Sequence, residues 1–265
     1  MSNPRFIYFL SFIFLSLVVS CKPSSEKSKE ETKVIVNVED TAFEAIFDGK
    51  TLENWQGDDA YWRVENGVLV GEVTIDKPLI NNTFLIFKDR ELSDFELKLD
   101  FKIETAGNSG INYRSEEVDS IPYALRGYQA DIDGKKKYTG QNYEERKRTT
   151  LAYRGENTIV EAQPNYTSTS SLGDNIKNNA WQSRNIVSSL GDEELLRDKI
   201  NSEEWNSCHL IIKGNRLQHY INGILMSEVE DQDSINFRKM GLLGLQLHVG
   251  PPMKVFYKNI RLKNL

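Results

Sequence analysis

A run of alternating residues between positions 95 and 103 constrains this chain more than any other feature of its sequence. Apolar side chains occupy the odd positions, from Phe95 to Ile103, and charged side chains occupy the even ones, from Glu96 to Lys102. A strand places successive side chains on opposite faces. The segment therefore predicts a β-strand with one face in a core and the other face in solvent.

The last third of the chain repeats this strand signal in a regular series. Asn222-Gly223 separates two of its apolar runs, and Asn66-Gly67 does the same much earlier in the chain. Asn-Gly between apolar runs supplies the positive φ angles of a tight hairpin turn. The apolar runs of the last third lie at residues 205–213, 216–221, 224–229, 242–249 and 255–262.

Short strands joined by tight turns indicate the fold class. We predict an all-β jelly-roll sandwich of two sheets, because strands of this length must bury one face against a second sheet. Acidic residues at the start of residues 192–200 favour a helix there, and it is the single short helix that we expect. The Ser/Thr/Asn-rich stretch at residues 164–179 is expected to be a loop.

Length and charge narrow the class of protein further. The chain has 265 residues, of which 39% are hydrophobic and 27% charged, which is an ordinary globular composition. Its formal net charge of -6 argues against nucleic acid as a partner, because phosphate binding needs a basic surface.

The N-terminus carries a secretion signal. Arg5 precedes an apolar run from Phe6 to Val19, which is short for a membrane span and has the length of a signal-peptide core. The run ends Leu-Val-Val-Ser-Cys at residues 17–21, which resembles a bacterial lipobox. We expect a lipoprotein signal peptide at residues 1–20, lipidation of Cys21, and a membrane-anchored protein of the bacterial cell envelope, on its periplasmic or outer-membrane surface. The alternative is a simple secretory signal that contains Cys21.

The mature chain then divides into a tether and a domain. Residues 21–41 are rich in Ser, Glu and Lys and have no aromatic residue, so we expect a flexible tether. Residues 42–265 form the predicted β-sandwich domain. Cys21 and Cys208 are the only cysteines. If Cys21 is acylated, Cys208 has no partner, and we expect it to be a buried apolar residue rather than half of a disulfide.

Two neighbouring polar strands are the strongest sign of a functional surface. Alternate positions of the first strand, residues 108–114, and of the second, residues 127–133, carry polar side chains on one face. Rows of amides, carboxylates and a guanidinium indicate a ligand-facing sheet surface, and two ordinary half-solvated strands are the alternative. The rows are Asn108, Asn112 and Arg114 on the first strand, and Gln129, Asp131 and Asp133 on the second.

The histidines divide by the faces on which they lie. Gln246 and His248 lie opposite the leucines of their strand, so His248 can join the polar rows. His219 shares the apolar face of Leu217 and Ile221, and on pattern alone it is structural. His209 is also expected to be structural.

The chemistry of the polar rows stays open at this point. Common signatures such as His-Glu-x-x-His and Gly-x-Ser-x-Gly are absent from the sequence. Asp131 and Asp133 can bind a hard cation or act as a base, and they can equally pair with Arg114 or Lys135. Amides, carboxylates and aromatic rings on one surface are also a carbohydrate-binding composition.

A series of motifs, in order and spacing, resembles the family of 3-keto-disaccharide hydrolase domain proteins. The resemblance covers roughly residues 42–265. The motifs are FDGKTLENW at 47–55, WRVENGVLVG at 62–71, NSGINYR at 108–114, GYQADI at 127–132, LQLH at 245–248 and KNIR at 258–261.

The resemblance implies a fold and an activity. It implies a concanavalin A-like jelly roll, and cleavage of glycosides or disaccharides already oxidised to a ketone at C3 of the sugar. It also implies secretion, often as a lipoprotein. This sequence departs from the family at residues 141–145 and 164–179, both at the expected substrate rim.

Such a reaction needs a base for the C2 proton and donors or cations for the resulting enediolate. Our hypothesis gives the base role to His248 or Asp131. It gives stabilisation of the enediolate to Arg114 and Gln129, with a divalent cation as an open alternative. The family motif makes His219 a pocket candidate, against its apolar face. The expected substrate-binding residues are Asn108, Asn112, Tyr128, Gln129, Asp133, Tyr143, His219 and Gln246.

Two other classes of function fit the same sequence. The first is a non-catalytic carbohydrate-binding surface lipoprotein, because jelly rolls often only bind their ligands. The second is a structural or adhesive surface lipoprotein. Titratable residues gathered in a closed pocket would favour an enzyme, and an open groove of Trp and Tyr would favour a binding module.

Overall fold

The structure is a computed structural model that describes residues 42–163 and 171–265. The predicted signal peptide, the tether and Cys21 lie outside these residues, as do residues 164–170 of the predicted loop. Across the described ranges, no helix is long and apolar enough to cross a membrane.

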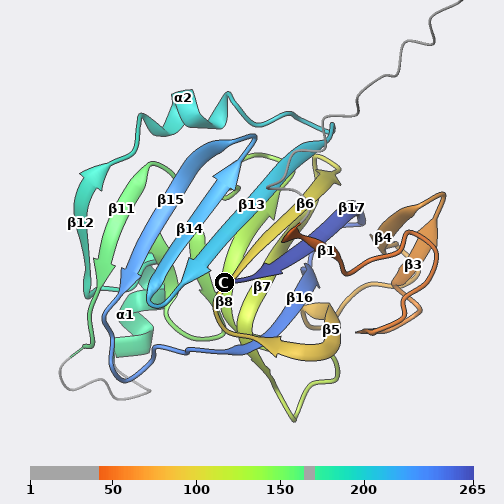
Figure 1. The fold of residues 1–265 in the computed structure, drawn as a ribbon, viewed down its shortest axis with the longest axis horizontal. Coiled ribbons are helices and arrows are strands. Elements are labelled where there is room, and N and C mark those ends of the chain that lie inside the picture. Colours follow the sequence, from red (N-terminus) through yellow and green to blue (C-terminus); the bar gives the residue numbers. More distant parts are fainter. Residues whose placement is uncertain (1–41, 164–170) are drawn as a thin grey trace, which may run out of the picture. The chain divides into compact units, whose positions relative to one another are not determined.

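Two β-sheets form a sandwich, which confirms the predicted fold class (Figure 1). The larger sheet has ten strands. All of its described pairings are antiparallel except that between β11 and β15, which is parallel. Its order is β12 (Arg184–Ser189), β11 (Glu156–Val160), β15 (Ile224–Asp231), β14 (Arg216–Ile221), β13 (Asn206–Lys213), β6 (Phe95–Ile103), β17 (Met253–Asn264), β4 (Val68–Val73) and β3 (Trp62–Glu65), and β1 (Glu44–Ala45) pairs with β17.

The smaller sheet has seven strands, and it carries the polar rows identified in the sequence. Strands β7 and β8 are neighbours in it, as predicted, and β16 lies on the other side of β7. Its order is β10 (Thr149–Ala152), β9 (Asn142–Glu145), β8 (Leu125–Asp133), β7 (Asn108–Glu117), β16 (Gly241–Leu247), β5 (Thr83–Leu92) and β2 (Trp55–Gln56).

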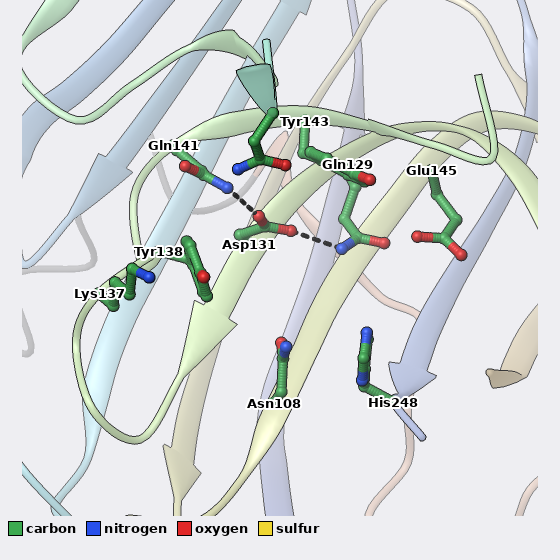
Figure 2. Close-up of a pocket in the computed structure, with 10 residues that line it drawn as sticks. Asn108, Gln129, Asp131, Lys137, Tyr138, Gln141, Tyr143, Glu145 and His248 are labelled. Atoms are coloured by element: carbon green, nitrogen blue, oxygen red, sulfur yellow. Dashed lines mark hydrogen bonds between the residues drawn. The ribbon is translucent and has the colours of Figure 1, made fainter. Parts of the chain in front are cut away.

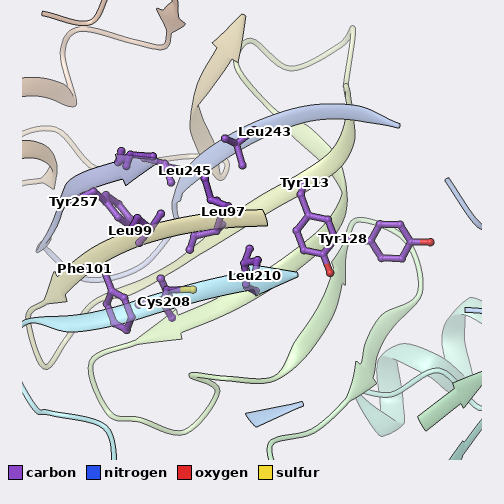
Figure 3. Close-up of a cluster of buried hydrophobic side chains, with 14 of the residues drawn as sticks. Leu97, Leu99, Phe101, Tyr113, Tyr128, Cys208, Leu210, Leu243, Leu245 and Tyr257 are labelled. Carbon is purple, nitrogen blue, oxygen red and sulfur yellow. The ribbon is translucent and has the colours of Figure 1, made fainter. Parts of the chain in front are cut away.

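The core lies between the two sheets (Figure 3). All of the odd-numbered residues of β6 are buried, and the even-numbered ones are partly exposed. The alternation in the sequence therefore marked the inner face correctly. Leu243 and Leu245 of β16 contribute from the opposite sheet. Cys208 is a free, buried cysteine of this core, as predicted, and burial raises the pKa of its thiol to about 12.

The predicted hairpin turns are present. Asn66 and Gly67 have φ angles of 50° and 82°, and Asn222 and Gly223 have 51° and 77°. Two consecutive left-handed residues are what a type I′ turn requires, and Asn-Gly adopts them at low steric cost.

The expectation of a single helix is wrong. Helix α2 (Glu193–Arg197) lies inside the predicted segment, and the Asp192 side chain caps it by accepting from two backbone N–H groups. Helix α1 (Ser171–Asn178) occupies part of the predicted loop. Its apolar residues, Leu172 and Ile176, are four positions apart as in a helix, but two residues in a Ser/Thr/Asn-rich stretch are too few to predict one, and Ile176 is exposed. Instead, the buried amide of Asn175 anchors it, with Oδ1 accepting from Gln163 and from the backbone of Gln182.

The packing of Trp62 on Gly71 gives a test of the core. A Cβ atom at Gly71 would lie 2.6 Å from the buried indole ring of Trp62. We therefore expect Gly71→Ala to lower the free energy of unfolding by about 1–3 kcal/mol, measured by urea denaturation. The matched control is Gly250→Ala, where a Cβ would meet no atom within 4 Å. Equal stability of the two variants would contradict this packing.

Candidate active site

A pocket of about 440 Å³ lies on the outer face of the seven-stranded sheet (Figure 2). Tyr128, Ala130 and Ile132 of β8 are buried in the core, so Gln129 and Asp131 face the opposite side. The volume is within the range of small-molecule sites. Its lining residues are Asn108, Gln129, Asp131, Lys137, Tyr138, Gln141, Tyr143, Glu145, Asn179 and His248.

Half of this pocket comprises residues that the sequence predicted. Strand pairing places Gly110 opposite Asp131, and Gln129 opposite Tyr143. The sheet thus aligns side chains from separate strands into one surface. His248 joins them because its backbone N–H, just after β16, donates to the carbonyl oxygen of Asn108 at 3.3 Å. The predicted residues in the pocket are Asn108, Gln129, Asp131, Tyr143 and His248.

The Asp131 carboxyl is the most perturbed acid of the pocket. It is 7% exposed, and each of its oxygens accepts one side-chain amide, from Gln129 and from Gln141. Burial raises its pKa from 3.8 to about 7, and these hydrogen bonds only partly oppose the shift. The negative charges of Glu145 and Asp133 add to it. A carboxyl with a pKa near neutrality has the proton affinity of a general base.

Tyr143 and Glu145 form one wall of the pocket. Burial, together with the Glu145 and Asp131 carboxyls, raises the pKa of Tyr143, so its phenol stays protonated and can donate a hydrogen bond. Glu145 Oε1 accepts from Asn82 Nδ2 at 3.0 Å. Asn82 Oδ1 accepts from the backbone N–H of Val249 at 2.9 Å, so Asn82 links Glu145 to the segment that carries His248.

Arg114 does not reach this pocket, contrary to our prediction. Its φ is 44°, and the pairing of β7 with β8 shifts register between Tyr113 and Glu116. The resulting irregularity breaks the alternation that placed Arg114 in the polar row. The buried guanidinium donates instead to the Ser93 and Gly214 carbonyls and to Asp94 Oδ1, and it lines a different cavity.

Tyr128 and His219 lie between the sheets rather than in the pocket. The Tyr128 hydroxyl donates to Asp231 Oδ2, and its ring stacks on Tyr113 with 5.5 Å between centroids. His219 Nε2 lies 2.9 Å from the Tyr113 hydroxyl, and burial lowers the pKa of His219 to about 4. It is therefore a neutral core histidine, as its apolar face in the sequence indicated.

The remaining predicted residues do not line the pocket, and two of them, Gln246 and Asp133, hold pocket residues in place. Gln246 is fully buried, and its Nε2 donates to Gln129 Oε1 at 3.1 Å. Asn112 is also buried, with Nδ2 3.4 Å from Ser115 Oγ. Asp133 accepts from the backbone N–H groups of residues 137–139, which holds in place the loop that carries Lys137 and Tyr138.

Sequence reasoning missed half of the pocket. Gln141 and Glu145 are each two positions from Tyr143, and a strand period over residues 141–145 would have found both. Lys137 and Tyr138 lie in a turn, and Asn179 follows α1, where no periodicity applies. The missed residues are Lys137, Tyr138, Gln141, Glu145 and Asn179.

A divalent cation does not fit this site. Both Asp131 oxygens already face amide N–H donors, which a bound cation would repel. Over residues 42–163 and 171–265, no group of three or more His, Cys, Asp or Glu side chains is placed to hold a metal.

The fold is a β-sandwich of two sheets, with a carboxyl-containing pocket on the outer face of one sheet. Residues 42–263 match the 3-keto-alpha-glucoside-1,2-lyase-like domain, and the chain belongs to this family.

Individual relatives are more distant. A Bacteroides thetaiotaomicron protein named 3-keto-disaccharide hydrolase is 31% identical over 103 residues, which is 36% of this chain and 35% of that protein. The match thus spans about a third of the relative's length. Two structures of Parabacteroides distasonis proteins, provisionally assigned as glycosyl hydrolases, share the fold with TM-scores of 0.52. They are 19% and 18% identical, and cover 86% and 84% of this chain and 95% and 99% of their own.

A substitution at Arg114 tests whether this residue stabilises the fold or acts in the active site. Arg114→Met leaves four acceptors without their buried donor, so we expect the free energy of unfolding to fall by about 2–4 kcal/mol. Any activity of the folded variant on a 3-keto-glucoside, the substrate class of the family, should stay within a few-fold of wild type, because Arg114 does not line the pocket. Urea denaturation and turnover of a 3-keto-glucoside measure the two effects. A large loss of turnover with full stability would restore Arg114 to the active site.

Asp131→Asn provides the matched comparison, because we expect it to raise stability where Arg114→Met lowers it. The pKa of Asp131 is raised, so the folded state holds this proton more tightly than the unfolded chain does. The stability that this tighter proton binding contributes is fully present below about pH 4 and is lost as the pH rises through about 7. We therefore expect Asp131→Asn to gain roughly 1–3 kcal/mol over wild type at pH 8, and to lose that advantage near pH 4.

Proposed function

We propose that this protein cleaves the glycosidic bond of 3-keto-glycosides by removing the C2 proton of the sugar. The observation that carries the proposal is the Asp131 carboxyl, buried in a sugar-sized pocket with a pKa of about 7. The family provides the substrate class, because its members are 3-keto-glucoside lyases or hydrolases.

The reaction follows from the acidity of the substrate. A ketone at C3 acidifies the C2–H bond, and the Asp131 carboxylate takes that proton. The electron pair passes into an enediolate and then forms the C1–C2 double bond as the C1–O bond breaks. The leaving oxygen takes up a proton. Addition of water across the double bond would complete a net hydrolysis, and release before this step would give a lyase.

Other pocket residues take the supporting roles. Lys137 supplies the positive charge near the enediolate that we had expected from Arg114. His248, which lies next to Asn108 in the lower part of Figure 2, gives a proton to the leaving oxygen. Gln129 and Gln141 hold the Asp131 carboxylate, so the base does not reorient during proton transfer.

A binding-only function fits the pocket less well. A sugar-binding groove typically presents aromatic faces, and among the described residues that line this pocket there is no tryptophan. The pocket gathers titratable groups instead, namely Asp131, Glu145, Lys137 and His248. A buried acid with a raised pKa among other titratable groups is what catalysis requires and what binding alone does not.

The pKa of Asp131 predicts the pH dependence of the activity. Asp131 must be ionised to accept a proton, so kcat/KM should rise with pH and level off above a midpoint near 7. Release of the aglycone from a 3-keto-glucoside, with its unoxidised parent as control, measures this. Asp131→Asn should lower the rate at least 100-fold above pH 7, and the difference should shrink at lower pH, where the wild-type carboxyl is itself protonated.

Proton removal can also be observed without bond cleavage. A 3-keto sugar lacking a leaving group at C1 should exchange its C2 hydrogen for deuterium in D₂O with the wild-type protein, and not with Asp131→Asn. Cleavage of the unoxidised parent, or wild-type exchange by the Asp131→Asn variant, would overturn the proposed chemistry.

We also propose that the protein is a lipoprotein of the bacterial cell envelope, attached to the membrane through Cys21. The Leu-Val-Val-Ser-Cys run at residues 17–21 supports this. Cys21→Ala should move the protein from the membrane pellet to the soluble fraction of the producing cells. Retention of the variant in the pellet would contradict lipidation at this residue.

A further inference from the structure

A chain of side-chain amides leads from Gln246 to the Asp131 carboxyl. Gln246 Nε2 donates to Gln129 Oε1 at 3.1 Å, and Gln129 Nε2 donates to Asp131 Oδ1 at 2.5 Å. A primary amide has one donating and one accepting end. Since Gln246 donates to the oxygen of Gln129, only the NH₂ end of Gln129 is left to face Asp131.

Gly110 makes the space that this chain occupies. Strand β7 lies between Gln246 on β16 and Gln129 on β8, and Gly110 is the β7 residue paired with Asp131. A Cβ atom at Gly110 would lie 2.5 Å from Cδ and 2.6 Å from Nε2 of Gln129. Gly110 is not among the residues with a left-handed φ. The glycine is therefore needed for space and not for backbone conformation.

Gln246, the first residue of the amide chain, also has contacts with the core. Gln246 is fully buried, and its side-chain oxygen has no partner among the described residues. The backbone oxygen of Gln246 accepts from Ser109 Oγ at 2.5 Å, and Ser109 Oγ lies 2.7 Å from the Tyr257 hydroxyl in the core. The backbone of Gln246 is thus held in place, and its buried side chain donates to Gln129 while its own acceptor is left unsatisfied.

We propose that Gln246 and Gly110 are positioning residues that act through Gln129, keeping the Gln129 NH₂ group on the catalytic carboxyl of Asp131. The inference rests on the proposed function, because it takes Asp131 as the base. Without Gln246, the Gln129 amide is free to turn its oxygen toward Asp131. An oxygen in that position repels the carboxylate and favours the protonated, inactive form.

Other charged or titratable groups surround Asp131, and a substitution at Gln246 or Gly110 leaves all of them in the protein. The two tyrosines of the pocket and four charged or titratable side chains come from β8, β9, the loop after β8 and the segment after β16. These groups are Asp133, Glu145, Lys137, His248, Tyr138 and Tyr143.

The test replaces Gln246 and follows the titration of Asp131 directly. The ¹³C carboxyl resonance of Asp131, assigned with Asp131→Asn in the full-length protein, reports its midpoint without any substrate. We expect Gln246→Met, which keeps the volume and removes the donor, to raise this midpoint by about half a unit to one unit. Gly110→Ala should act in the same direction. The acid limb of kcat/KM should shift equally, so the loss of rate is larger at pH 6 than at pH 9.

A buried glutamine elsewhere provides the control. Gln163 is buried and donates to Asn175 Oδ1, away from the pocket lining. Gln163→Met should lower stability without moving the Asp131 titration or the pH profile. An unchanged midpoint in Gln246→Met would overturn the positioning role, whatever the activity. Failure to cleave 3-keto-glycosides, with the midpoint shifted as expected, would overturn the proposed function and leave the amide chain intact.

Discussion

The two faces of the seven-stranded sheet are the constraint on which the site depends. Each strand sends alternate side chains to the core and to the outer face, so any residue of the pocket has neighbours that are packed between the sheets. On β8, Tyr128 and Ile132 are buried on one side while Gln129 and Asp131 face the pocket on the other. The geometry of the pocket is thus as exact as the packing of the core beneath it.

The core beneath β9 is polar rather than apolar. Arg148 is fully buried with Glu144, Asp231 and Asp233 as ionic partners, at 2.6 Å from Asp231 and 3.2 Å from Asp233. Burial of such charges costs more than an apolar core of the same volume would, and it is tolerated where each charge has partners. Glu144 is on β9 between the pocket residues Tyr143 and Glu145, so the buried ion pairs hold that wall in register.

The sequence allowed the fold and about half of the site to be predicted, and the physical reason is periodicity. Alternation identified the inner face of β6 and the row of Gln129 and Asp131, because both depend only on local strand geometry. Alternation failed at Arg114, where a positive φ and a register shift are set by the neighbouring strand. It could not place Lys137, which a turn carries, or find α1, whose anchor is one buried amide.

Backbone groups hold the loop after β8 in place, while its side chains line the pocket. Asp133 holds this loop through the backbone N–H groups of residues 137–139, at 2.7–3.0 Å, and every residue except proline has a backbone N–H. Substitution of Lys137 or Tyr138 by any residue other than proline therefore changes the groups offered to a substrate and keeps the donors that hold the loop. The groups that this loop presents to the pocket can therefore change by point mutation while the hydrogen bonds that hold the loop are kept.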